Sequence, residues 1–101
     1  MHAGPTIVIP APDRVPASFA EAIEAYLGFL QLERGLSPNS VAAYSNDLAQ
    51  CALYLSRKRT CAGWPAVRSD DLSAWLQSLT TNELAPASLA RKLSALRGLY
   101  R

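Results

Sequence analysis

The sequence predicts a small all-α protein, a bundle of four helices preceded by a flexible proline-rich tail. Glycine is rare, alanine and leucine are abundant, and no stretch alternates apolar and polar residues as a strand does. Four segments instead carry apolar residues at helical spacing, joined by short connections that contain proline, glycine or serine. A chain of 101 residues has room for one domain with one modest hydrophobic core.

Residues 1–17 form the predicted tail. They hold Pro5, Pro10, Pro12 and Pro16 among small side chains, and proline removes the backbone donor that helices and ladders need. We expect this segment to be disordered, although residues 6–9 would also fit a short extended piece. The folded domain then covers residues 18–101.

The first helix is expected from about residue 19 to residue 34. Ser18 and Glu21 have the spacing of a capping box, and Gly35 suits the position just after a helix end. The residues that share its inward face are Phe19, Ile23, Tyr26, Leu27 and Leu30.

The second helix begins with Ser37 as its N-cap and Pro38 in its first position. Its inward stripe is Val41, Tyr44, Leu48, Cys51, Ala52 and Leu55. The opposite face is small and polar and comprises Asn39, Ala43, Asn46, Gln50 and Arg57. This face leads into a basic run, so it fits close approach to a phosphate backbone, and it equally fits an ordinary solvated surface.

A loop over residues 60–68 contains a glycine and a proline, and Trp64 is expected to fold back over the core. Ser69 is expected to cap the third helix, with Asp70 and Asp71 in its first turn, where acidic side chains favour the helix dipole. Its core face is Leu72, Trp75, Leu76 and Leu79.

The fourth helix begins at Pro86, where a missing backbone N–H costs nothing. Its apolar stripe is Leu89, Leu93, Leu96 and Tyr100, and its basic residues Arg91, Lys92, Arg97 and Arg101 lie off that stripe. The pattern is still running at Arg101, without a stop signal, which indicates a domain cut from a longer protein.

Positive charge is segregated along the chain. The net charge of +2 is too small to establish a polyanion partner, but basic residues outnumber acidic ones in the second half. The basic residues there are Arg57, Lys58, Arg59, Arg68, Arg91, Lys92, Arg97 and Arg101, against Asp70, Asp71 and Glu83.

No catalytic set, metal site or cofactor motif is apparent. The single histidine lies in the tail, capping explains the paired aspartates, and the spacing of Tyr100 places it with core leucines. Cys51 and Cys61 fit free thiols in a reducing cytoplasm, with a disulfide as the alternative. There is no membrane-spanning run and no signal peptide. We therefore expect a cytoplasmic, non-enzymatic chain.

Three stretches resemble the core-binding domain of tyrosine recombinases, most closely that of Xer-type recombinases and related phage-type integrases. They are FLQLERGLSPNSVAAYSNDL at 29–48, VRSDDL at 67–72 and LARKLSALRGLY at 89–100. Typical family patterns here are a helix ending in E-R-G-L-S, then Y-x-x-D-L, an acidic entry to the third helix, and a last helix like I-A-R-R-L-S-A-L-R-x-F-Y.

This resemblance implies a SAM-like orthogonal four-helix bundle that forms half of a DNA clamp during DNA integration, recombination or chromosome partition. It implies that the second and fourth helices face duplex DNA, and that the parent also touches neighbouring recombinase protomers. The catalytic tyrosine and its helpers belong to a separate C-terminal domain that this chain lacks. Tyr100 does not match the nucleophile.

The candidate DNA-binding residues combine this resemblance with the basic run. They are Asn39, Ser40, Asn46, Arg57, Lys58, Arg59, Ser88, Arg91, Lys92 and Arg97. Ala42, Ser45 and Asn46 stand where relatives often carry basic residues, so we expect the isolated, monomeric domain to bind double-stranded DNA weakly. The alternative function is a helical protein–protein interaction domain without DNA contact.

Overall fold

The computed structural model describes residues 15–81 and 85–100, and every regular element in those ranges is helical. The prediction of an all-α fold with four helices is confirmed. The elements are α1 (Ala17–Leu32), α2 (Pro38–Lys58), the 3₁₀ turn η2 (Trp64–Ala66), α3 (Ser69–Thr81) and α4 (Pro86–Leu99). Most of the predicted tail lies outside the described residues. Its end does not behave as tail, because Val15 is buried and α1 starts at Ala17.

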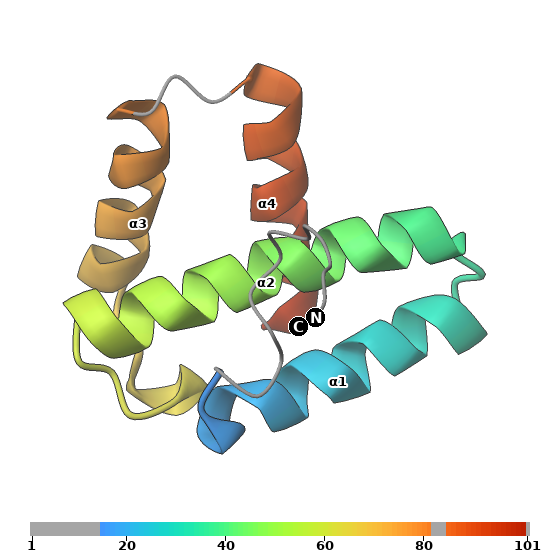
Figure 1. Cartoon of the computed structure of the whole chain (residues 1–101), viewed down its shortest axis with the longest axis horizontal. Coiled ribbons are helices and arrows are strands. Elements are labelled where there is room, and N and C mark those ends of the chain that lie inside the picture. The colour runs from blue at the N-terminus through green and yellow to red at the C-terminus, as the bar shows by residue number, and fades with distance from the viewer. Residues whose placement is uncertain (1–14, 82–84, 101) are drawn as a thin grey trace, which may run out of the picture.

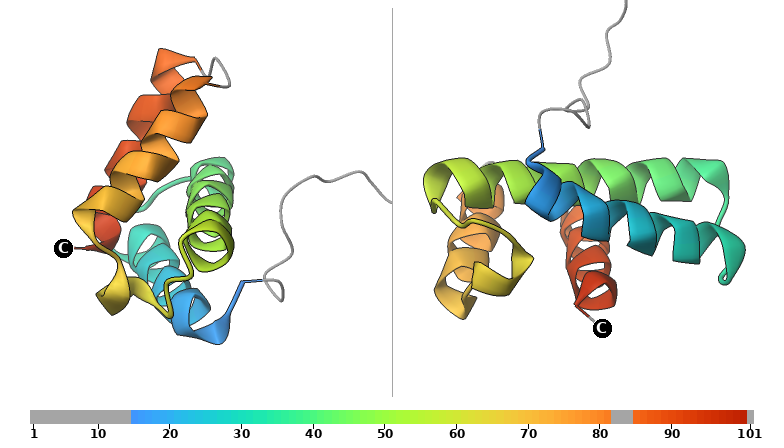
Figure 2. Two further views of the ribbon diagram at one scale, coloured as in Figure 1. Left: turned by 90° about the vertical axis from the view of Figure 1, so that its left-hand side faces the viewer. Right: turned by 90° about the horizontal axis from the view of Figure 1, so that it is seen from below.

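The helices form two layers that cross one another. α1 and α2 run side by side in opposite directions, and α3 and α4 both lie on one side of that pair (Figures 1 and 2). α3 and α4 run across α2 rather than along it, with α4 near the middle of α2 and α3 at its C-terminal end (Figure 1). This is the orthogonal arrangement expected for a SAM-like bundle, and it brings the α4 side chains against α2.

The N-cap of α2 follows the sequence, whereas α1 ends at Leu32, two residues before the expected end at Arg34. Ser37 accepts a hydrogen bond from the backbone N–H of Ser40 (3.2 Å), with Pro38 in the first helical position. Gly35 has φ of +64°, a left-handed conformation that suits glycine, and it lets the Leu36 N–H donate to the Leu30 carbonyl. The turn between α1 and α2 is therefore fixed by local chemistry.

The predicted N-caps of α1 and α3 are both wrong. Neither Ser18 nor Ser69 caps its helix in the structure. α1 has Pro16 at its N-cap, and the Ser18 hydroxyl donates instead to the carbonyl of Ala62 in the loop before η2. At α3, Ser69 is already helical. The carboxylate of Asp71, the third residue of α3, instead accepts a hydrogen bond from the backbone N–H of Arg68, the residue just before the helix (2.8 Å).

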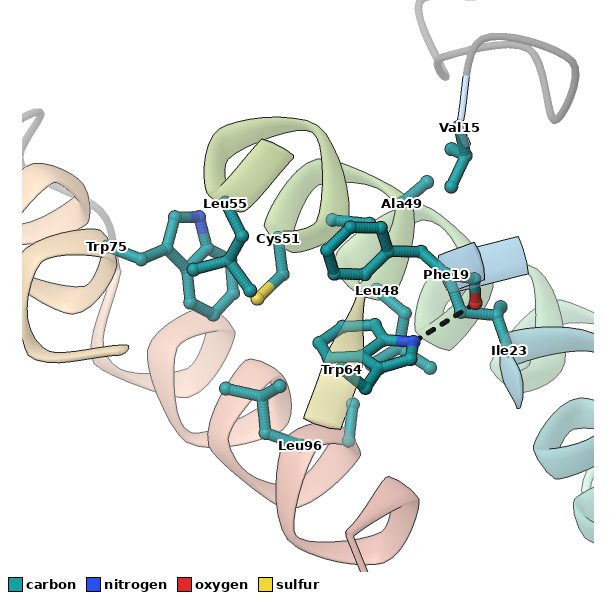
Figure 3. Packing of buried hydrophobic residues seen from close by; sticks show 12 residues of the cluster. Val15, Phe19, Ile23, Leu48, Ala49, Cys51, Leu55, Trp64, Trp75 and Leu96 are labelled. Atoms are coloured by element: carbon teal, nitrogen blue, oxygen red, sulfur yellow. Dashed lines mark hydrogen bonds between the residues drawn. The ribbon is translucent and has the colours of Figure 1, made fainter. Parts of the chain in front are cut away.

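Trp64 is buried against the core, as predicted, and it joins the start of α1 to the end of α4. Its indole N–H donates to the Phe19 carbonyl at 3.0 Å, and its ring meets Phe19 edge-to-face with centroids 4.9 Å apart (Figure 3). On its other side it meets the Tyr100 ring edge-to-face, and the Tyr100 hydroxyl donates to the Trp64 carbonyl. The surrounding core is contributed by Phe19, Ile23, Leu48, Cys51, Ala52, Leu55, Trp75, Ala95 and Leu96.

The buried face of α4 differs from the predicted stripe. Its buried residues are Lys92, Ala95 and Leu96, while Leu89 and Leu93 are only partly buried. Tyr100, also predicted on the core stripe, is 47% exposed. The helix is rotated so that a lysine, not Leu89 or Leu93, is its most enclosed long side chain. Periodicity alone could not reveal this, because it assumes that a basic residue faces solvent.

Gly98 allows α4 to approach α1 closely. A Cβ atom at this position would overlap the hydroxyl and ring carbons of Tyr26. Gly28, in the interior of α1, has open space where its Cβ would lie. The two helical glycines therefore differ in what a methyl group would meet.

We predict opposite outcomes for the same substitution at these glycines. Gly98→Ala should lower the free energy of unfolding by about 1–2 kcal/mol, because overpacking outweighs the gain in helix propensity. Gly28→Ala should raise it by about 0.5–1 kcal/mol. Urea unfolding followed by circular dichroism measures both, and equal effects at the two sites would contradict the close approach of Tyr26.

Candidate nucleic-acid interface

A buried carboxylate lies between α2 and α4. Asp47, 1% exposed, accepts hydrogen bonds from Arg91 Nε (2.7 Å) and Nη2 (3.0 Å), and from Lys92 Nζ (2.6 Å). Lys92 Nζ also donates to Gln50 Oε1 at 3.0 Å. Arg91 and Lys92, which are adjacent on α4, therefore both pair with one acidic residue of α2.

Lys92 was expected to contact DNA, and the structure gives it another role. The residue is 4% exposed and its ammonium group is satisfied inside the protein by Asp47 and Gln50. A buried carboxylate needs a partner of opposite charge, which is the physical reason that this lysine turns inward. We therefore remove Lys92 from the candidate phosphate contacts.

Arg91 remains at the surface, with 38% of its side chain exposed. The pair with Asp47 raises the pKa of the Arg91 guanidinium, mainly through their hydrogen bonds, so the group stays charged. It lines a surface hollow of about 410 Å³ at the start of α2, and the other lining residues are Leu36, Asn39, Ser40, Ala43 and Tyr44. The structure thus brings together three of the predicted contacts, Asn39, Ser40 and Arg91.

A second hollow adjoins the first, since both are lined by Leu36 and Tyr44. It measures about 350 Å³ and brings Arg97 of α4 next to Arg34 at the end of α1. Among residues 15–81 and 85–100, no acidic side chain lines either hollow. We use the name basic hollow surface for six of the polar residues that line them, namely Arg34, Asn39, Ser40, Tyr44, Arg91 and Arg97.

Sequence reasoning missed Arg34 and Tyr44. Arg34 was taken as the end of a helix and Tyr44 as a core residue, although it is only partly buried and also lines both hollows. The available signal was the ERGLS stretch itself, which puts an arginine directly before the Gly35 turn and hence beside the start of α2.

The remaining candidates lie apart from this surface or are partly enclosed. Arg57 and Lys58 are exposed at the C-terminal end of α2, about 20 Å along the helix from Tyr44. Ser88 is partly buried and lines neither hollow. Asn46 is partly buried, and its Oδ1 is enclosed without a hydrogen-bond partner among the described residues.

Arg59 belongs to a second ion pair. Its Nε donates to Asp71 Oδ1 at 2.8 Å, while Asp71 Oδ2 accepts the Arg68 N–H and the Cys61 thiol. The Arg59 hydrogen bond is the main cause that lowers the pKa of Asp71 below its ordinary value. Asp71 therefore ties the end of α2 to the start of α3. The Arg59 side chain is about as exposed as that of Arg91, at 37%, but it lines neither hollow.

The buried thiol of Cys51 and the hydroxyl of Tyr100 fit structural roles. Burial raises the pKa of the Cys51 thiol to about 12 and that of Tyr100 to about 12, so neither is activated as a nucleophile. Within residues 15–81 and 85–100, no three His, Cys, Asp or Glu side chains are grouped to hold a metal ion. None of the described helices is long and apolar enough to cross a membrane.

Comparison with known proteins defines the family. The family model of the phage integrase N-terminal SAM-like domain matches residues 23–101, so the chain belongs to this family, and the resemblance seen in the sequence is confirmed.

The relatives in this family are named tyrosine recombinases. Tyrosine recombinase XerC of Herpetosiphon aurantiacus is 34% identical over 80 residues, covering 79% of this chain and 26% of that protein. Tyrosine recombinase XerC of Roseiflexus castenholzii is 38% identical over 80 residues, covering 79% and 25%. Tyrosine recombinase XerD of Oceanobacillus iheyensis is 30% identical over 79 residues, covering 78% and 27%.

The chain thus spans about a quarter of the length of the curated relatives that it matches. No solved structure gives a significant match.

We predict that Asp47→Ala lowers the free energy of unfolding by about 3–5 kcal/mol, because it leaves the buried Lys92 ammonium without its counter-charge. Asp70→Ala, at an exposed position in the first turn of α3, should cost no more than about 1 kcal/mol. Chemical unfolding of both variants at pH 7 provides the comparison. A cost for Asp47→Ala as small as that of Asp70→Ala would contradict the buried ion cluster.

A pH dependence follows from Asp71. Because folding lowers the pKa of this carboxyl group, its stabilising effect is complete above its ordinary pKa and is lost as the pH falls through the lowered value. Unfolding free energies measured from pH 7 down to about pH 2 should therefore fall less steeply for Asp71→Asn than for the wild type. If the unfolding free energy of Asp71→Asn falls with decreasing pH as steeply as that of the wild type, Asp71 does not cause this pH dependence.

Proposed function

We propose that this chain is a DNA-binding domain of a site-specific tyrosine recombinase and clamps duplex DNA at the recombination site. The carrying observation is that Arg34, just before α2, and Arg91 and Arg97 of α4 converge on two adjoining hollows, whose lining includes no acidic side chain among the described residues. Membership of the phage integrase N-terminal family supports the same proposal.

The chemistry of the basic hollow surface suits a phosphate backbone. Arginine presents several N–H donors in a plane that matches two phosphate oxygens. Asn39 and Ser40 lie in the first turn of α2, where the helix dipole adds positive potential and where polar side chains can reach phosphate or sugar. Tyr44 adds an aromatic edge between the two hollows. The surface is therefore suited to positioning DNA rather than to reacting with it.

Strand cleavage and rejoining in the proposed parent would then belong to residues outside this chain. Tyr100, which directly follows α4, donates its hydroxyl to the Trp64 carbonyl and has a raised pKa. We propose that a tyrosine in a following catalytic domain performs the reaction and that the present domain holds the duplex against it.

Protein contact is a second candidate function, favoured by an apolar face of α1. Phe29 is 47% exposed and Leu32 is 83% exposed, which is unusual for large apolar side chains. Phe29 also lines an apolar groove of about 530 Å³ between α1 and the end of α4. We propose this face as the contact with neighbouring recombinase protomers. Its groove borders the basic hollow surface, because Arg34 lines both.

We predict salt-dependent binding to a short DNA duplex. If Arg34, Arg91 and Arg97 each contact one phosphate, the association constant should fall about 40-fold between 50 and 200 mM salt. Arg97→Ala should weaken binding and reduce the slope of log K against log salt concentration by about 1. Fluorescence anisotropy at several salt concentrations measures both quantities.

Arg68→Ala is the matched control, since Arg68 is exposed but lines neither hollow. It removes the same charge and should change the slope less than Arg97→Ala does. Amide shifts on adding DNA should cluster at residues 34–44 and 91–98. Their absence, together with salt-insensitive binding, would favour the protein-interaction alternative.

A further inference from the structure

Asp47 is the one buried carboxylate among the described residues that touches the basic hollow surface, and it does so through Arg91. A negative charge beside a proposed DNA contact is at first sight unfavourable. The geometry of the three hydrogen bonds on Asp47 explains why it can be useful.

The carboxylate holds the guanidinium of Arg91 by one edge. Nε and Nη2 bind the two oxygens of Asp47, so the plane and direction of the group are both fixed. An arginine has five N–H donors, and this arrangement uses only two of them. The others have no partner among the described residues, and the side chain lines the hollow beside Asn39 and Ser40.

Lys92 keeps this arrangement electrostatically favourable. Its buried ammonium lies 2.6 Å from Asp47 Oδ1, and Gln50 accepts a further hydrogen bond from it. One carboxylate and two cations leave the cluster with a net charge of +1. The negative charge of Asp47 is thus balanced inside the protein, and the charge of Arg91 stays available at the surface.

We propose that Asp47 is a positioning residue that fixes Arg91 for contact with a DNA phosphate, with Lys92 as its internal counter-charge. The inference rests on the proposed function and adds a buried acidic residue to the determinants of DNA affinity. Ordering a free arginine on binding would cost entropy, and Asp47 removes that cost because the side chain is ordered beforehand.

The test is the paired variant Asp47→Asn with Lys92→Met, which leaves the net charge of the chain unchanged. Replacement of a buried ion pair by neutral groups of similar size is often tolerated, so the variant is expected to fold, which circular dichroism verifies. We expect its affinity for a short duplex at about 50 mM salt to fall roughly three- to tenfold. Because net charge is constant, long-range electrostatics cannot produce this loss.

A double-mutant cycle identifies Arg91 as the group through which Asp47 acts. Arg91→Ala should weaken DNA binding in the wild-type background and have a smaller effect in the paired variant. In ¹⁵N spectra of the wild type, the Arg91 Nε–H should be protected from solvent exchange by its bond to Asp47. That measurement needs no variant, so it tests the positioning bond even if the paired variant does not fold.

Three results would overturn the proposal. Wild-type affinity or tighter binding in the paired variant, with Arg91→Ala still harmful to the wild type, would remove the positioning role and leave the proposed function intact. An unprotected Arg91 Nε–H would remove the positioning bond. No effect of Arg91→Ala in the wild type would instead overturn the phosphate contact of Arg91 itself, and the positioning role with it.

Discussion

The buried carboxylate of Asp47 is the constraint on which the arrangement of α2 and α4 depends. A charge 1% exposed is tolerated only when cations satisfy it, so α4 must present Arg91 and Lys92 to α2 and cannot rotate freely in the bundle. That orientation turns Ala95 and Leu96 into the core and leaves Leu93 partly exposed. The orientation also carries Arg97 to the junction of α1 and α2.

The other end of the bundle is fixed by different chemistry. Trp64 in η2 bonds the Phe19 carbonyl, and Tyr100 bonds the Trp64 carbonyl, so one aromatic side chain joins the first and last helices. Asp71 holds Arg59 and the Arg68 N–H and sets the direction in which α3 leaves α2. α4 is therefore tied at Asp47 by charge and at Trp64 by aromatic packing, which gives the basic hollow surface a rigid support.

The helices and most core residues could be predicted because local patterns specify them. Ser37 and Pro86 mark helix starts as the sequence indicated, and Phe19, Leu48 and Leu55 are buried as their spacing required. The candidate interface was only partly predictable. Asn39, Ser40, Arg91 and Arg97 do line the two hollows, but Arg34 and Tyr44 were overlooked and Lys92 was assigned to the surface when it is buried.

The sequence by itself determined the helical fold, the turn at Gly35, the membership of a recombinase domain family and the positive charge of the last helix. Only the tertiary structure decided which of two adjacent cations, Arg91 or Lys92, remains at the surface. Both are basic, successive on one helix and bonded to Asp47, a residue 44 or 45 positions away in sequence. Their difference depends on where each side chain lies around that carboxylate: Lys92 also bonds Gln50 and is 4% exposed, whereas the Arg91 side chain is 38% exposed. A helical wheel describes one helix against solvent, whereas burial of a charge depends on what the neighbouring helix offers to pair with it.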